Sequence, residues 1–421
     1  MDWQKILAWF KEPISNFSIT IFRVVFGSIM LIQTYYFIAS GFIENNIIKP
    51  FILFPFISGL EPLSESGLML ISFLMLMSNI GMLFNKTARA SILIFLFCFT
   101  YFWLLDKSYF NNHYYFISIM CFLLFLVDKH SSFRSKIYVP RISLFALQFM
   151  VFLTYFIAGL NKLNPYWLVD LQPMGFILEV KCDTTENMLF IHPLLIGFMS
   201  YFGVLFDLAI GFLLFFRKTK VIGFILAISF NIVNYLLFSE IGEIGVFPFI
   251  MISTLILFIE PENLIKKFNI QEENKETKIN SGILNKFIIC FLTIQIILPF
   301  RHVFFKGYVD YNGIGQRFSW RMKSMCKESW TPGYINFSVF IKDLDNVNTN
   351  VGHFNLYNMD TLFQNQFDIN DNLYLTENQR QKLLYYPDLL PFFAKKIESV
   401  LHEKILTSYN NDLNFMIYSE C

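Results

Sequence analysis

Charged residues are scarce in this 421-residue chain: Asp, Glu, Lys and Arg make up 15% of it, whereas hydrophobic residues make up 55%. Soluble domains carry about a quarter charged residues. The composition therefore excludes an ordinary soluble protein and indicates one that crosses the lipid bilayer several times. The net charge of +1 and the lack of basic stretches interleaved with aromatic residues argue against a nucleic-acid partner.

Motifs for metal and phosphate binding are also missing. The six cysteines show no CxxC spacing, the Cys/His spacings of metal sites do not occur, and there is no glycine-rich phosphate loop. We therefore expect no metal ion. No cleavable signal peptide precedes the first apolar run. Instead, apolar residues recur at helical spacing within Met1–Pro13, which predicts a short helix on the membrane surface.

Long apolar runs, by contrast, are plentiful. We predict nine spans, at roughly 17–39, 67–84, 88–105, 110–127, 142–160, 193–216, 219–238, 244–259 and 284–300. The proline-bounded stretch 50–60 is too short to cross and favours a re-entrant or interfacial segment. The predicted fold is an all-α membrane domain over residues 1–300, followed by a small α+β domain outside the membrane over residues 301–421.

Lysine and arginine collect before the first predicted span and in every second connection after it. Positively charged connections stay on the cytoplasmic side. The N-terminus is therefore expected in the cytoplasm, and residues 301–421 on the exoplasmic side.

The polar tail contains strand and helix patterns. Residues 335–341 alternate between apolar and mostly polar side chains, as in a strand with one apolar face. Thr376 to Gln379 has the capping-box pattern that opens a helix, and a second helix is predicted at about 388–404, after Pro387.

Lys162 closes the fifth predicted span. An amine at the boundary between hydrocarbon and water is costly to place, which makes it a functional candidate. Lysines at helix ends also commonly extend to the interface without any further role, and position alone favours that interpretation.

Other polar groups fall near span ends at the same predicted face. Asn111 to Tyr115 opens the fourth span, where a helix cap with interfacial tyrosines is the ordinary interpretation and a polar ligand site around His113 the functional one. Arg301 and His302 follow the ninth span, and arginines beside tryptophan there are ordinary anchors. Asp207, inside the sixth span, needs a partner, either structural or in the substrate.

A further polar set borders the seventh and eighth spans. It contains Asn231, Asn234, Glu240 and Glu243, with Gly242 and Gly245 providing a bend before Pro248. A loop that dips into the membrane interface explains this set without any function.

Several of these segments occur together in one known family. The sequence resembles the vitamin K-dependent γ-carboxylases, as a short, HTTM-type member, from about the first span to residue 404. The resemblance rests on separate motifs in the same order. These are His113 with its asparagines, the block 155–167, the block 234–248, Leu298-Pro299-Phe300-Arg301-His302, Arg317-Phe318-Ser319-Trp320-Arg321-Met322, Tyr374-Leu375-Thr376 and Tyr386-Pro387-Asp388.

The resemblance implies a membrane enzyme that couples two reactions. Such enzymes oxidise reduced vitamin K (the hydroquinone) with O2 to the epoxide, and carboxylate peptidyl glutamate with CO2. In that family the base that deprotonates the hydroquinone is the lysine that matches Lys162, and the histidine that matches His113 acts at the quinone site. Further candidates for binding the hydroquinone or the substrate are Asn112, Asn161, Trp167, Asn231, Arg301, His302, Arg317 and Trp320.

Burial of Lys162 against Phe156, Leu160 and Trp167 would favour the neutral amine that such a base requires. The chain also departs from the family. Asn231 stands where a histidine is expected, residues 240–243 resemble an insertion, and the chain is much shorter than the animal enzymes. The alternative is a membrane quinone-binding or transport protein on the same scaffold that has lost carboxylation.

Overall fold

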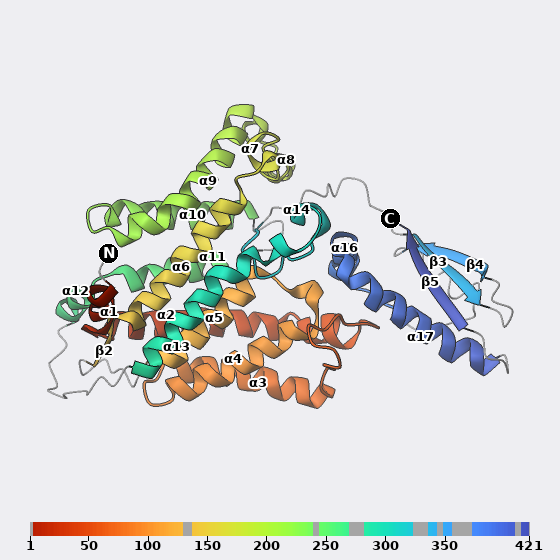
Figure 1. The fold of residues 1–421 in the computed structure, drawn as a ribbon, viewed down its shortest axis with the longest axis horizontal. Helices are drawn as coiled ribbons and strands as arrows, with labels where there is room; N and C mark the ends of the chain where they lie inside the picture. Colours follow the sequence, from red (N-terminus) through yellow and green to blue (C-terminus); the bar gives the residue numbers. More distant parts are fainter. Residues whose placement is uncertain are drawn as a thin grey trace.

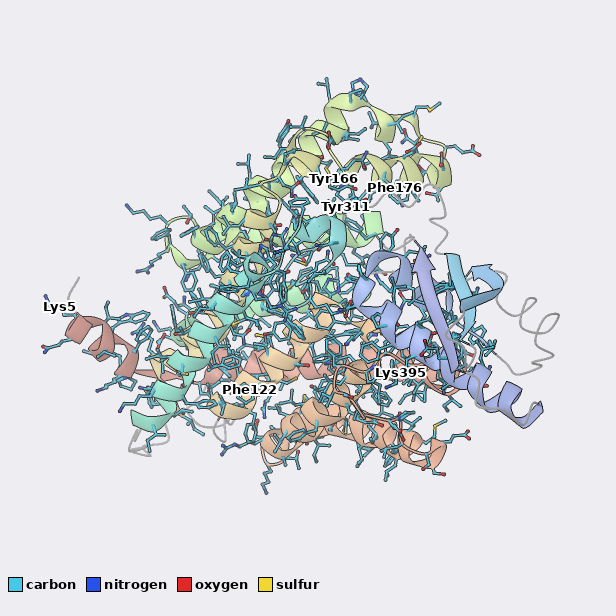
Figure 2. All side chains as sticks on the ribbon, turned by 45° about the vertical axis from the view of Figure 1, so that its right-hand side comes forward. Lys5, Phe122, Tyr166, Phe176, Tyr311 and Lys395 are labelled. Atoms are coloured by element: carbon cyan, nitrogen blue, oxygen red, sulfur yellow. The ribbon has the colours of Figure 1, made fainter. Side chains whose placement is uncertain are left out.

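The computed structural model describes residues 3–128, 137–238, 244–268, 282–322, 336–342, 348–355, 373–408 and 414–420. In this part of the chain, a large helical bundle leads into a smaller tail of helices and strands (Figure 1). The two ends of the bundle differ. In Figure 2, Lys5 of the N-terminal helix lies at one edge of the molecule, whereas Lys395 of the tail lies in the opposite half.

Each of the nine predicted spans coincides with a helix. Seven are long and apolar enough to cross a membrane, which confirms the polytopic membrane class. They are α2 (Phe17–Ala39), α3 (Glu65–Met82), α4 (Ala88–Leu105), α6 (Arg141–Asn161), α9 (Pro193–Phe215), α10 (Lys220–Phe238) and α13 (Gly282–Ile297), the last extended by the 3-10 turn η5 (Leu298–Phe304).

The remaining two predicted spans are less regular. Helix α5 (Asn112–Val127) has 16 residues, about 24 Å at 1.5 Å per residue, against about 30 Å of hydrocarbon. Helix α11 (Phe247–Thr254) continues as the 3-10 turn η4 (Leu255–Phe258) and then bends by 91° into α12 (Pro261–Lys267). Pro261 occupies the first helical position of α12 and suits such a new start.

The end of the bundle far from the tail carries the short helix α1 (Trp3–Lys11) and the antiparallel pair β1 (Pro13–Ser15) and β2 (Tyr138–Pro140). A helix was predicted for this N-terminal segment, and its place on the membrane surface stays a prediction. The guanidinium of Arg23, 1% exposed, lies 3.1 Å from Asp128 Oδ2, while Asn16 donates to Asp128 Oδ1. This ion pair is hidden inside the bundle, where removing one partner alone would be costly.

Residues 50–60 form no helix. After a π-helical turn, η1 (Glu44–Ile48), this segment runs in an irregular conformation and buries Ile52 and Phe54 against the tail, in a core with Phe337, Leu383 and Phe393. The backbone amide of Phe51 donates to the Tyr374 carbonyl, and that of Lys107 to the Phe54 carbonyl. The segment therefore joins the bundle to the tail.

The tail has the predicted α+β character. Strands β3 (Asn336–Lys342), β4 (Asn348–Asn355) and β5 (Asn414–Glu420) form an antiparallel sheet in the order β4-β3-β5. Helix α16 (Glu377–Tyr385) opens with the predicted capping box, in which Gln379 donates its amide to Thr376 and accepts the Thr376 amide. Helix α17 (Leu390–Ser408) follows the turn η6 (Pro387–Leu389).

One buried carboxyl also joins the two parts. Gln379 Nε2 donates to Asp106 Oδ2 and to the Ile52 carbonyl, at 2.8 Å each, and Asp106 Oδ1 accepts the Ser108 amide. Burial raises the pKa of Asp106 to about 6, although these hydrogen bonds act in the opposite direction.

Candidate functional site

Two glycines bring α6 and α9 close together. A Cβ added at Gly159 of α6 would lie 2.9 Å from both the Cγ and the backbone nitrogen of Leu208 on α9. Conversely, the ring of Phe152 on α6 packs directly against Gly211 of α9, where an added Cβ would clash with it. Small residues at helix interfaces allow this close approach, and it positions the end of α6 beside Asp207.

Lys162 and Asp207 form a buried ion pair. Lys162 is the C-cap residue of α6, and its Nζ lies 2.6 Å from Asp207 Oδ2; the two residues are 9% and 3% exposed. The Lys162 Nζ also lies 4.6 Å from the ring centroid of Trp167. The carboxylate and the aromatic face each interact favourably with an ammonium group.

Local sequence explains the position of Trp167. Asn164 caps the short helix α7 (Pro165–Leu168) by accepting the Trp167 amide, and Pro165 occupies the first helical position. Trp167 Nε1 then donates to the Ser200 carbonyl of α9. Trp167 therefore covers the amine of Lys162 while being fixed to the helix that carries Asp207.

A second group of side chains holds residues 316–322, which we call the crossing segment. Asn161, beside Lys162, donates to the Ser319 carbonyl at 2.8 Å, and Asn112, beside His113, donates to the Arg321 carbonyl at 3.1 Å. The start of α5 and the end of α6 are thus joined through carbonyls only two residues apart. This brings the Lys162 and His113 neighbourhoods together at one end of the bundle.

The crossing segment carries a buried tryptophan. Trp320 is 1% exposed and packs against Tyr115 and Phe116 of α5. Its backbone φ of 56°, like the 64° of Phe318, lies in the left-handed region that side-chain-bearing residues seldom adopt. Both residues that adopt this unusual backbone conformation also pack their aromatic rings against Tyr115 of α5.

The arginines lie around the same segment. Arg321 contacts Asp310 through Nη1 and His302 Nε2 through Nη2, at 2.5 and 3.2 Å. Arg301 lies over the ring of Phe318, with 5.2 Å between its Cζ and the ring centroid.

Arg317 reaches the tail. Its Nη1 donates to Asp388 Oδ2 at 2.7 Å, and its guanidinium stacks on Tyr386. The crossing segment therefore contacts the bundle on one side and the tail on the other.

Two further predicted residues contact aromatic side chains of neighbouring helices. His113 stacks on Phe247 of α11, with ring centroids 3.8 Å apart and planes 10° apart. Asn231 of α10 donates to the Tyr155 hydroxyl at 2.9 Å and to the Ala227 carbonyl at 2.8 Å. Tyr155 lies on α6, six residues before Asn161. Glu240, Glu243 and the expected insertion lie outside the described residues.

The structure corrects one expectation about Lys162. Burial against Phe156, Leu160 and Trp167 was expected, and no charged partner was predicted for the amine, but Asp207 supplies a carboxylate from the neighbouring helix. The sequence indicated that Asp207 needs a partner, yet it contained no signal that this partner is Lys162, 45 positions earlier. The snorkelling interpretation is also wrong for this side chain, because its amine points into the protein and is buried.

Comparison with known families adds two matches. The HTTM domain matches residues 11–262, and the lumenal domain of vitamin K-dependent gamma-carboxylase matches residues 280–419. No solved structure matches the chain. Lys162, His113 and Asp207 lie within the first matched region, and the crossing segment lies within the second.

Proposed function

This chain belongs to the vitamin K-dependent γ-carboxylase family, and we propose that it oxidises reduced vitamin K with O2 to the epoxide and couples this reaction to carboxylation of glutamate with CO2. The observation that carries the proposal is the buried contact between Lys162 and Asp207. Titratable groups paired and shielded from water are typical of active sites.

The pair provides a route for a proton. Asp207 Oδ2 takes a proton from the Lys162 ammonium, to which it is hydrogen bonded, and this leaves a neutral amine. The amine then accepts the proton of a substrate hydroxyl, so that Lys162 acts as the general base. The total charge of the pair does not change in the first step, which limits its cost in a poorly solvated site.

Two buried polar atoms suit a hydroquinone. Among the described residues, Asn112 Oδ1 and Trp320 Nε1 are buried without a hydrogen-bond partner. A phenolic hydroxyl both donates and accepts, so it can satisfy an amide oxygen and an indole N–H of this kind. When bound, the hydroquinone supplies the electrons that reduce O2. Asn112 and Trp320 would hold it, and His113 and Phe247 would flank it with stacked rings.

The arginines around the crossing segment suit a negatively charged co-substrate. Among the described residues, Arg301 Nε and Arg317 Nη2 are buried without a hydrogen-bond partner. Guanidinium groups bind carboxylates well, so we assign this side of the site to a glutamate-containing peptide. The peptide would arrive from the exoplasmic side, where we place the tail.

Turnover with purified protein tests the proposal. Reduced vitamin K, O2, bicarbonate and a glutamate peptide are supplied, and the epoxide and fixed CO2 are measured. Lys162→Ala should abolish epoxide formation, whereas Lys49→Ala, an exposed lysine paired with Glu44, should not change it. Asp207→Asn should lower epoxide formation at least tenfold if Asp207 takes the proton.

The products distinguish the alternatives. Epoxide without fixed CO2 would mean that the oxidation is retained and the carboxylation lost. If well-folded protein forms neither product, the enzyme hypothesis is contradicted, and a quinone-binding or transport protein remains as the alternative. An unchanged rate in Lys162→Ala would remove Lys162 as the base.

A further inference from the structure

Three cations share one carboxylate where the tail meets the bundle. Asp388, in the turn η6, lies 2.7 Å from Arg317 Nη1 and 3.9 Å from Lys107 Nζ. Arg301 interacts electrostatically with both Arg317 and Asp388. We call these four residues the Asp388 cluster. In the described part of the chain no other carboxylate pairs with its cations, so three cations against one carboxylate give it a net charge of +2.

The cations of the Asp388 cluster lie on aromatic rings and are largely shielded from water. Arg301 lies over the ring of Phe318. Arg317 lies over the ring of Phe56, whose centroid is 5.8 Å from that of Phe318. The Lys107 and Arg317 side chains are 14% and 10% exposed. Because water screens such charges poorly, the excess positive charge favours the binding of a further anion.

Unpaired guanidinium atoms indicate the kind of anion. Arg301 Nε and Arg317 Nη2 are buried, and among the described residues neither of them has a hydrogen-bond partner. Carboxylates accept guanidinium N–H groups, often two at a time. The crossing segment, which contains Arg317, is also held to the residue next to Lys162 by the Asn161 hydrogen bond. A carboxylate bound here would therefore lie in the part of the molecule that contains the buried ion pair.

The carboxylate of Asp388 can leave this position without loosening the tail. Its side chain is 42% exposed, unlike the cations it contacts, so it can turn into water. The tail is held by other contacts, because residues 376–379 bind residues 106–109 through three hydrogen bonds of side chains. Leu389, next to Asp388, is buried in the core that the tail shares with residues 50–60.

We propose that the Asp388 cluster binds the side-chain carboxylate of the substrate glutamate, and that Asp388 occupies this site until the substrate displaces it. The inference rests on the proposed function, which assigns the arginines to a glutamate-containing peptide. It adds Lys107 as a third cation and Asp388 as a competitor within the chain. Exchange of one carboxylate for another leaves the charge of the site unchanged, so the cations stay neutralised to the same extent before and after binding.

Binding of a capped glutamate, N-acetylglutamate amide, tests the exchange without turnover. This probe carries one carboxylate, whereas the matched probe N-acetylglutamine amide carries none. The melting temperature of the full chain in detergent is followed against probe concentration. Asp388→Asn should bind the glutamate probe at least about fivefold more tightly than the native protein, as expected if Asp388 leaves the site open about a fifth of the time. The glutamine probe should shift neither protein.

Matched variants separate the exchange from a general change of charge. Glu377→Gln removes another tail carboxylate, which is 60% exposed and pairs with Arg380 on its own helix, and it should leave the affinity unchanged. Added to Asp388→Asn, Arg317→Leu should abolish binding of the glutamate probe, whereas Arg380→Leu should not. Asp388→Ala should show the same gain in affinity as Asp388→Asn, so the result does not depend on the folding of one variant.

Two outcomes would overturn the proposal: binding of the glutamate probe by Asp388→Asn that is no tighter than in the native protein, or equal shifts with the two probes. Neither measurement requires epoxide or fixed CO2, so this inference and the proposed function fail separately. Turnover with an unchanged affinity in Asp388→Asn would retain the enzyme and remove the exchange. Tighter binding in that variant without turnover would retain the carboxylate site and remove the proposed reaction.

Discussion

Gly159 and Leu208 set the distance between α6 and α9. The Cα of Gly159 faces both the backbone and the side chain of Leu208, with no space for a methyl group. Asp207 precedes Leu208, and Lys162 follows Gly159 by three residues. The close contact between Gly159 and Leu208 therefore allows the Lys162 amine and the Asp207 carboxylate to lie 2.6 Å apart.

Gly159→Ala should separate the two helices. Overpacking of this kind typically costs about 1–3 kcal/mol, and it should also lower epoxide formation because Lys162 moves away from Asp207. Denaturant unfolding in detergent measures the first effect and turnover the second. Gly203→Ala on α9 is the control, because an added Cβ there meets nothing within 4 Å; equal losses in both variants would contradict the account.

A double-mutant cycle tests the energetics of the ion pair. Lys162→Met and Asp207→Leu should each destabilise the protein, by about 3–5 kcal/mol, because each leaves one charge buried and unpaired. The double variant should recover most of that loss, since apolar residues can replace a buried pair. Additive losses in the free energy of unfolding would mean that the two side chains are not coupled.

The Asp106–Gln379 contact predicts a dependence on pH. The carboxyl has an ordinary pKa of 3.8, and burial raises the pKa of Asp106 to about 6. Between these values the folded protein binds more protons than the unfolded chain, so stability falls as pH rises through this window. The contribution of protonated Asp106 to the free energy of unfolding is complete below pH 3.8 and is lost above about pH 6. It amounts to at most about 3 kcal/mol.

Unfolding measured between about pH 4 and pH 6.5 checks this sign. Asp106→Asn should reduce the slope of stability against pH in that range, although it loses the hydrogen bond from Gln379. Asp183→Asn serves as the control, because Asp183 is an exposed residue of α8 (Met174–Thr185) and its substitution should leave the slope nearly unchanged. Stability that increases with pH over this range in the native protein would contradict the prediction.

Asn161 should limit the opening of the crossing segment. Asn161→Ala removes the hydrogen bond to the Ser319 carbonyl, worth about 1 kcal/mol. Trypsin cleavage after Arg317 or Arg321 should then accelerate about fivefold, as followed by mass spectrometry. Asn187→Ala, which removes a cap on a distant exposed turn, should leave these cleavage rates unchanged.

Features that repeat along the chain could be predicted from sequence, and features that depend on contacts between distant segments could not. Apolar runs such as 17–39 gave helices with the expected bounds, and the capping box at Thr376 formed as its pattern indicated. The partner of Asp207 depends on the packing of α6 against α9, so no local pattern indicates it. The same holds for residues 50–60, whose apolar side chains pack against a tail more than 270 positions later.

The Lys162 region shows both cases. Its place at the end of a span followed from the apolar run before it. The inward direction of its side chain followed from Trp167 and Asp207, which belong to two other helices. Hydropathy indicates how deep in the membrane a residue of a helix lies. It indicates much less about which neighbouring helix supplies the partner of a charged side chain.

The core that Ile52 and Phe54 share with Phe337, Leu383 and Phe393 bears on how the protein can be divided. The two family matches suggest a cut between residues 262 and 280, but this cut would separate the two halves of one hydrophobic core. A tail produced alone would display the apolar side chains that normally cover residues 50–60, and the truncated bundle would display Ile52 and Phe54. The two matched regions are therefore successive in sequence but behave as one unit of assembly.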